Sequence, residues 1–259
     1  MAAENSDGGS FTIGGVFGRA FGVMGHNPLV AFGVSFMLAA LPGALLSYLL
    51  INLRLDLQQS GVFQGVVVSA VIGSVVYLVL RSLVQGCLAR ATVADSEGRQ
   101  ASLGECLATA FSRLLPLIGT TLLFVLAVLA GSVLLIVPGI MVGVAFAVVI
   151  PVTVEERVGV IAAFGRAADL TRGARWKVFG LLLVMAIVLW VLAAIAGLFQ
   201  LLIVGVPQVG TMPMSYIVFN AVITTISATF AATITTGLYV ELREWKDGPL
   251  DAKLGEIFE

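Results

Sequence analysis

The sequence predicts an all-α, polytopic integral membrane protein with about six transmembrane helices and three interfacial amphipathic helices in a pseudo-repeated arrangement. The first observation is composition: of 259 residues, 59% are apolar and 11% are charged, and the mean hydropathy is +1.07. A soluble globular protein carries roughly 25% charged residues. The second is a series of long uncharged apolar runs, and the third is the concentration of basic residues in alternate loops. This composition argues against a soluble enzyme, a disordered chain and a nucleic-acid-binding protein.

Six apolar segments are long enough to cross a bilayer, which takes about 20 residues. A β-barrel would instead show alternating segments of about 10 residues. We expect a disordered N-terminus over 1–10, a single helical membrane domain over 11–245 and a cytoplasmic tail over 246–259. The fourth span is short, so the sequence leaves open whether it crosses fully or is re-entrant. The expected spans are 28–52, 62–80, 117–137, 140–154, 178–204 and 214–240.

Charge placement predicts the orientation of the chain. With six spans, both termini and alternate loops lie on one side. Only Arg54 falls on the opposite side. The positive-inside rule therefore places both termini in the cytoplasm of a multi-pass protein of the bacterial inner membrane. The basic residues expected on the cytoplasmic side are Arg19, Arg90, Arg99, Arg113, Arg157, Arg166, Arg172, Arg175, Lys177, Arg243, Lys246 and Lys253.

Three segments on that side have the periodicity of interfacial amphipathic helices, at 11–25, 102–114 and 158–171. In the first, apolar residues such as Val16, Ala20 and Met24 share one face, and glycines and Arg19 share the other. The strings FGRAF, LATAF and FGRAA align without gaps in the three segments. Each segment precedes a membrane hairpin, so the chain is predicted to contain three units of one interfacial helix and two spans.

A family resemblance rests on short motifs along most of the chain. In the family, Pro-Gly-Ile precedes a short span, a Pro-Val pair leads into an acidic residue, and an amphipathic helix ends in Thr-x-Gly-x-x-Trp. The chain resembles the membrane domain attached to some bacterial glycerophosphoryl diester phosphodiesterases. The resemblance implies a membrane module of about six helices, without phosphodiesterase activity because the catalytic domain is absent. Ala167 stands where the family often has Ser. The matching residues are Asn27, Pro28, Pro138, Gly139, Ile140, Pro151, Val152, Glu155, Thr171, Gly173 and Trp176.

A basic cluster with an interfacial tryptophan opens the fifth span, and its members are Arg172, Arg175, Trp176 and Lys177. This combination is typical of a site for anionic lipid headgroups, although it also serves plain anchoring and orientation. Arg81 lies near the cytoplasmic boundary of the second span. We expect it to anchor that span by extending toward the interface, or to bind a lipid phosphate, or to pair with Glu155 or Glu156.

A second candidate site is a polar stripe within the membrane. Asn220, Thr224 and Ser227 share one face of the sixth span, and Gln200 comes from the fifth. The stripe is explained either by helix packing or by a polar cavity. The second explanation favours a small-solute or lipid transporter or channel, and it predicts a continuous water-filled cavity near Asn220 and Gln200.

Residues for catalysis are not visible in the sequence. There is one histidine, His26, and the two cysteines, Cys87 and Cys106, lack metal-ligand spacing. We therefore expect no catalytic residues, no metal and no cofactor. The leading hypothesis is a non-enzymatic scaffold or lipid-interacting module. Its expected partners are membrane lipids with anionic headgroups, which the basic cluster favours. The sequence leaves a protein partner or a homo-oligomer open, and we expect no nucleic acid.

Overall fold

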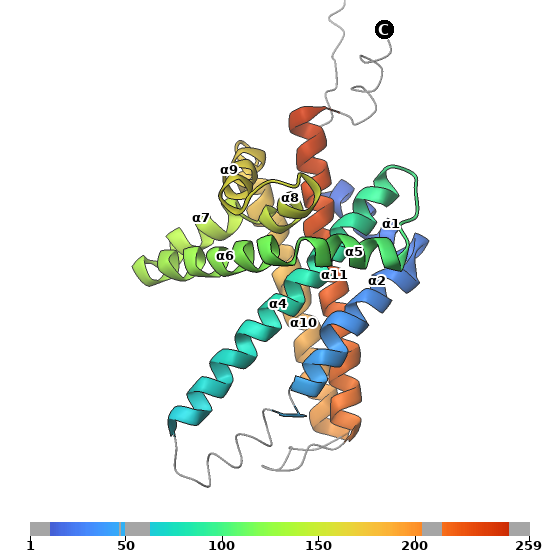
Figure 1. Cartoon of the computed structure of the whole chain (residues 1–259), viewed down its shortest axis with the longest axis vertical. Helices are drawn as coiled ribbons and strands as arrows, with labels where there is room; N and C mark the ends of the chain where they lie inside the picture. Colours follow the sequence, from blue (N-terminus) through green and yellow to red (C-terminus); the bar gives the residue numbers. More distant parts are fainter. Residues whose placement is uncertain (1–10, 47, 50–62, 204–213, 249–259) are drawn as a thin grey trace, which may run out of the picture.

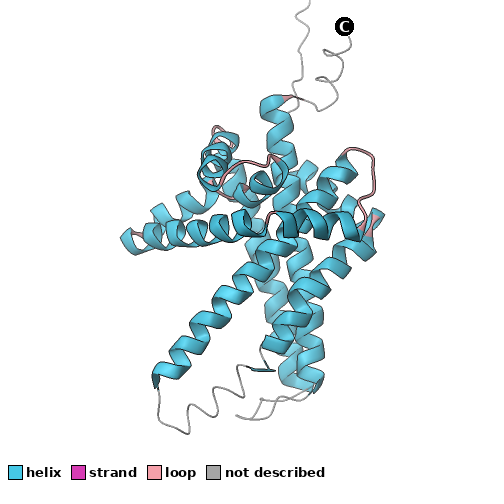
Figure 2. Ribbon diagram, in the orientation of Figure 1, coloured by secondary structure: helices cyan, strands magenta, loops and turns pink. Residues whose placement is uncertain are grey.

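A computed structural model describes residues 11–46, 48–49, 63–203 and 214–248 of the chain. The described residues are helical apart from short connections, and none is in a strand (Figure 2). Six helices of this part are long and apolar enough to cross a membrane. The prediction of an all-α, polytopic membrane protein is therefore confirmed. The expected N-terminus over 1–10, Arg54 and most of the 246–259 tail lie outside the described residues.

The interfacial helices are α1 (Ile13–His26), α5 (Leu103–Ser112) and α9 (Val160–Thr171). α1 and α5 each begin after a residue whose side chain caps the helix, and α9 begins after Gly159. The Thr12 hydroxyl accepts the Gly15 amide at 3.2 Å, and Ser102 accepts the Glu105 amide at 3.2 Å. These side chains satisfy donors that the first turn of a helix leaves free.

The remaining helices form the membrane region of the molecule. α2 (Pro28–Ser35) starts at a proline and continues into the π-helical segment η1 (Phe36–Ala40). α6 (Leu114–Leu134) and α7 (Ile136–Ala145) form a hairpin, and a turn at 146–148 separates α7 from α8 (Val149–Glu155). The two longest spans of the second half are α10 (Arg175–Ile203) and α11 (Met214–Asp247).

The second span differs most from its expected bounds of 62–80. α4 runs from Phe63 to Ser96, and its apolar membrane candidate covers Gly73–Ser96. The helix continues past Arg81 because its apolar periodicity continues: Leu83, Val84, Cys87 and Leu88 are all buried. The charged residues of this stretch lie on a face that meets the interfacial helices. The charge of Arg81 therefore does not mark the end of α4, which continues to Ser96.

The interfacial helices pack on the protein in a cyclic order. α5 packs on α4, α9 packs on α8, and α1 packs on α11, the last described helix. α5 and α9 thus each lie on the helix that directly precedes them, and α1 closes the ring by lying on α11. This order matches the predicted pseudo-repeat. We call this part of the molecule, where α1, α5, α9 and the end of α11 gather, the charged end (Figure 1).

The buried rows of the interfacial helices are spaced by three or four residues. They are Val16, Ala20 and Val23 in α1, Cys106 and Ala110 in α5, and Ala163, Ala167 and Leu170 in α9. Neighbouring apolar side chains remain exposed, among them Phe21, Phe111 and Ile161. Each of these helices therefore has a row that faces protein and a second row free to contact lipid.

The α6–α7 hairpin has an unusual direction. In Figure 1 it runs crosswise to α10 and α11, whereas α2 and α4 extend toward the opposite end from the charged end. Its tip is apolar, and Val133, Leu135, Ile136 and Val137 are exposed. The backbone at the tip is hydrogen-bonded, since the Leu135 amide donates to the Gly131 carbonyl at 3.1 Å. The Leu135 amide therefore has an internal partner, as a backbone donor placed in hydrocarbon requires.

Candidate functional site

An apolar groove of about 460 Å³ lies between α7 and the start of α10. Val137, Ile140, Met141 and Val144 line it from α7, and Arg175, Trp176 and Phe179 line it from α10. The four α7 residues follow the i, i+3, i+4, i+7 spacing that places side chains on one helix face. The groove therefore has apolar walls along its length and one cation at the end where α10 begins.

Arg175 and Trp176 give this groove a polar, aromatic mouth. Both side chains are exposed, and Trp176 is 86% exposed. The Trp176 ring packs edge-to-face on Phe179 with ring centroids 6.1 Å apart. Arg175 forms no ion pair with any described residue, so its five donors are free for a ligand. The positive end of the α10 dipole adds to the charge of Arg175 at this mouth.

The other two members of the predicted basic cluster lie differently. Arg172 is exposed on the turn between α9 and α10 but does not line the groove. The Lys177 ammonium donates to the Phe11 carbonyl at 3.1 Å and lies 5.8 Å from the Phe11 ring centroid. Lys177 therefore ties the start of the described chain to α10. The structure brings Arg175 and Trp176 together in one site, whereas Lys177 binds the Phe11 carbonyl outside it.

Arg81 lies apart from this groove, at a second cavity of about 300 Å³ between α4, α6, α8, α10 and α11. Its guanidinium carbon is 5.6 Å from the centroid of the Tyr77 ring. Within the described part of the chain Arg81 forms no ion pair, and Glu155 and Glu156 bind other arginines. The sequence placed Arg81 in the same group as the interfacial basic residues, but the fold separates them.

The members of the polar stripe lie in different surroundings within the described structure. Asn220 and Thr224 line a pocket of about 80 Å³ whose other walls come from η1, residues 43–44 and Tyr77 of α4. Neither Gln200 nor Ser227 lines this pocket. The Gln200 amide nitrogen is buried without a hydrogen-bond partner among the described residues. The water-filled cavity near Asn220 and Gln200 therefore stays a prediction.

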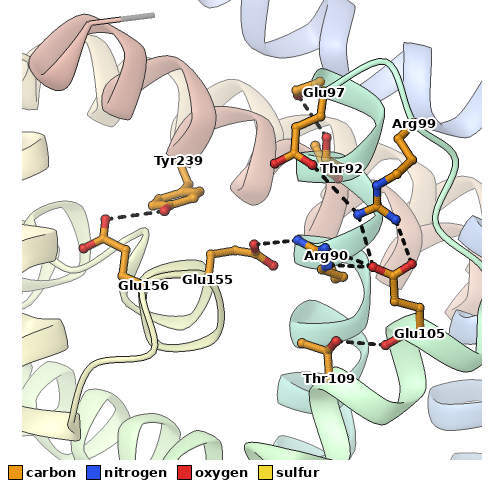
Figure 3. Close-up of polar contacts among 10 residues, drawn as sticks. Arg90, Thr92, Glu97, Arg99, Glu105, Thr109, Glu155, Glu156 and Tyr239 are labelled. Carbon is orange, nitrogen blue, oxygen red and sulfur yellow. Dashed lines mark hydrogen bonds and ion pairs between the residues drawn. The ribbon is translucent and has the colours of Figure 1, made fainter. Parts of the chain in front are cut away.

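Sequence reasoning missed a network of ion pairs at the charged end (Figure 3). Arg90 of α4 lies between two carboxylates, with Nε 3.0 Å from Glu105 Oε1 and Nη1 3.5 Å from Glu155 Oε2. Arg99 also reaches Glu105, at 2.8 Å. Hydrogen bonds from Arg99 and Arg90 hold the pKa of Glu105 below its ordinary value. The Glu155 side chain is 8% exposed, so Arg90 balances a largely buried charge.

Ion pairs between an arginine and two carboxylates also hold the other two interfacial helices, α1 and α9. Arg19 of α1 binds Glu241, at 3.0 Å, and Glu244 of α11. Arg166 of α9 binds Glu156, at 2.9 Å, and Asp247. These partners lie up to 225 positions apart in the sequence. One feature of the sequence hinted at these ion pairs: Arg19 and Arg166 occupy the same position in the aligned strings FGRAF and FGRAA.

The chain matches no protein-family model, no curated protein and no solved structure. The resemblance to the membrane domain of the phosphodiesterases stays a prediction. Among the residues that the structure describes, no group of three or more His, Cys, Asp or Glu side chains is placed to hold a metal ion. The candidate site therefore rests on the geometry of the groove alone.

Proposed function

We propose that this protein is a non-enzymatic, lipid-interacting protein of the bacterial inner membrane, which binds an anionic phospholipid in the groove between α7 and α10. One observation carries the proposal: a single groove joins the apolar stripe of α7 to Arg175 and Trp176. An acyl chain matches the stripe, and a phosphate matches the guanidinium, which binds such groups with two parallel hydrogen bonds. Trp176 lies where amphipathic aromatic side chains meet headgroups.

The distribution of charge supports an orientation with the charged end in the cytoplasm. Arg19, Arg90, Arg99 and Arg166 all belong to this end, together with their carboxylate partners. Cytoplasmic segments of inner-membrane proteins carry an excess of Lys and Arg. In this orientation Arg175 faces the anionic lipids of the cytoplasmic leaflet. A scaffold role for the charged end, with a protein partner, is compatible with lipid binding in the groove.

Native mass spectrometry of the purified chain tests the proposal. We expect the wild-type protein to retain phosphatidylglycerol in a neutral detergent, and Arg175→Gln to reduce the bound fraction about tenfold. The reason is that loss of one charge-assisted bidentate contact costs roughly 1.5–3 kcal/mol, and about 1.4 kcal/mol corresponds to a factor of ten.

Arg157→Gln is the matched control, because Arg157 is also exposed at the charged end but does not line the groove. Met141→Gln places a polar amide in the apolar stripe and is expected to weaken binding without a change of charge. Equal retention of phosphatidylglycerol by wild type, Arg175→Gln and Met141→Gln would rule out the groove as the site. Equal losses in Arg175→Gln and Arg157→Gln would show a general effect of charge.

A further inference from the structure

The cavity at Arg81 is a second cavity in the membrane region, distinct from the α7–α10 groove. Its volume of about 300 Å³ is at the lower end of the range for small-molecule sites, roughly 300–1,000 Å³. Five helices contribute walls, and α11 contributes only small residues there, such as Ala228, Ala231 and Ala232. The small side chains on α11 leave the space that bulkier residues would fill.

One side of the cavity is polar. Arg81 and Gln85 of α4 are one helical turn apart and both line it, and Thr121 of α6 lines it as well. Thr121 is 6% exposed, and its hydroxyl has no hydrogen-bond partner among the described residues. A buried hydroxyl is expected to have a partner, so the Thr121 hydroxyl is available to hydrogen-bond a molecule bound in this cavity.

Arg81 differs from the arginines of the charged end. Arg19, Arg90, Arg99 and Arg166 each bind a carboxylate. Arg81 is half-buried, its guanidinium carbon lies 5.6 Å from the centroid of the Tyr77 ring, and it forms no ion pair with a described residue. A cation in a membrane-embedded cavity is costly unless an anion balances it. The cavity therefore favours a negatively charged occupant.

The opposite walls are apolar, with Phe124 from α6, Ile150 from α8, and Met185 and Leu189 from α10. A cavity with one cation and an apolar body matches an amphipathic molecule with one anionic group and one alkyl chain. We propose that this cavity is an internal binding site for a single-chain amphipathic anion, whose carboxylate or phosphate is held by Arg81. The site is separate from the phospholipid groove and does not depend on it.

Native mass spectrometry of the full chain in a neutral maltoside detergent tests this site with three probes that share one chain. They are oleate, 1-oleoyl-lysophosphatidylglycerol and the uncharged oleyl alcohol. We expect one of the two anions to bind wild type at least tenfold more tightly than the alcohol. Preference for oleate identifies a carboxylate site, and preference for the lysophospholipid identifies a phosphate site. If neither anion exceeds the alcohol, the proposal is overturned.

Variants locate the binding. Arg81→Gln is expected to lower the affinity for the preferred anion at least tenfold and to leave the affinity for the alcohol unchanged. Ala231→Leu keeps Arg81 but fills part of the cavity, so it is expected to weaken binding of the same anion. Arg175→Gln, in the α7–α10 groove, is expected to leave the affinity for this anion unchanged. Unaltered binding in both Arg81→Gln and Ala231→Leu, or loss in Arg175→Gln alone, overturns the assignment to this cavity.

Discussion

Glu105 shows how single side chains attach an interfacial helix to the membrane region. Its carboxylate accepts hydrogen bonds from Arg90 on α4 and from Arg99 before α5, and its own amide is capped by Ser102. One acidic residue thus joins α4, the connection and α5. Exposed ion pairs contribute little individually, but a network of pairs holds its members in one geometry.

The pH dependence of this attachment follows from the lowered pKa of Glu105. Hydrogen bonds from Arg99 and Arg90 lower it from the ordinary value of 4.5. Glu105 therefore makes its full contribution to stability at pH values above about 4.5. That contribution is lost as the pH falls through the lower pKa that Glu105 has in the folded state. We expect wild type to melt at a higher temperature than Glu105→Gln at neutral pH, and the difference to shrink toward zero on acidification. A difference that is independent of pH would contradict this role.

At the scale of elements, close approach of backbones sets how α1 lies on α11. A Cβ atom at Gly237 of α11 would lie 3.0 Å from the Val16 carbonyl oxygen of α1. In the hairpin, a Cβ atom at Gly139 of α7 would lie 3.0 Å from the backbone of Ser132. Glycine at these contacts allows the helices to approach each other more closely than a residue with a larger side chain would permit.

Substitution of Gly237 tests the α1–α11 contact. We expect Gly237→Ala to lower the free energy of unfolding by about 1–3 kcal/mol, because the added methyl group overpacks the interface. Gly197→Ala is the control: this glycine lies within the apolar helix α10, and a Cβ there meets nothing within 4 Å. Alanine has the higher helix propensity, so the control is expected to be neutral or slightly stabilising. Equal unfolding midpoints for the two variants would mean that α1 does not require close contact at Gly237.

At the scale of the whole molecule, the crosswise hairpin bears on the number of membrane crossings. α6 and α7 are apolar enough to span, yet in Figure 1 they lie across α10 and α11. If α10 and α11 run through the bilayer, the α6–α7 hairpin lies across them and does not reach the far side of the membrane. Both ends of the α6–α8 segment remain near the charged end in either case, so the predicted location of the termini does not depend on this point.

Cysteine labelling in intact cells tests this arrangement. The native Cys87 and Cys106 are buried, and burial raises the pKa of the Cys106 thiol to about 11, so the background at pH 7.5 is expected to be low. We expect a cysteine at Leu135 to resist a charged maleimide from both sides, whereas a cysteine at Gln100 reacts once the inner membrane is permeabilised. Labelling of position 135 from outside would instead show that the hairpin crosses the membrane.

A reporter fused after Arg54 tests the orientation of the first hairpin, and we expect it to lie in the periplasm.

The sequence was sufficient for features that depend on local periodicity and not for those that depend on distant contacts. The interfacial helices and the pairing of Arg175 with Trp176 at the start of α10 follow from residues close together in the chain. The binding of Arg19 to Glu241, the direction of Lys177 toward Phe11, and the cavity around Arg81 depend on how the helices pack. The end of α4 was missed at Arg81, although the apolar periodicity continues beyond it, and Arg90 is accommodated there by partners on other helices.

Photo-crosslinking most directly tests the central claim that an anionic phospholipid occupies the α7–α10 groove. Phosphatidylglycerol with a diazirine in one acyl chain would be activated on the full chain in nanodiscs, and the labelled peptides identified by mass spectrometry. We predict labelling concentrated on Val137, Ile140 and Met141 of α7 and reduced in Arg175→Gln. Labelling spread evenly over exposed apolar faces, including Leu183 and Ile187 of α10, and unchanged in Arg175→Gln, would contradict the claim.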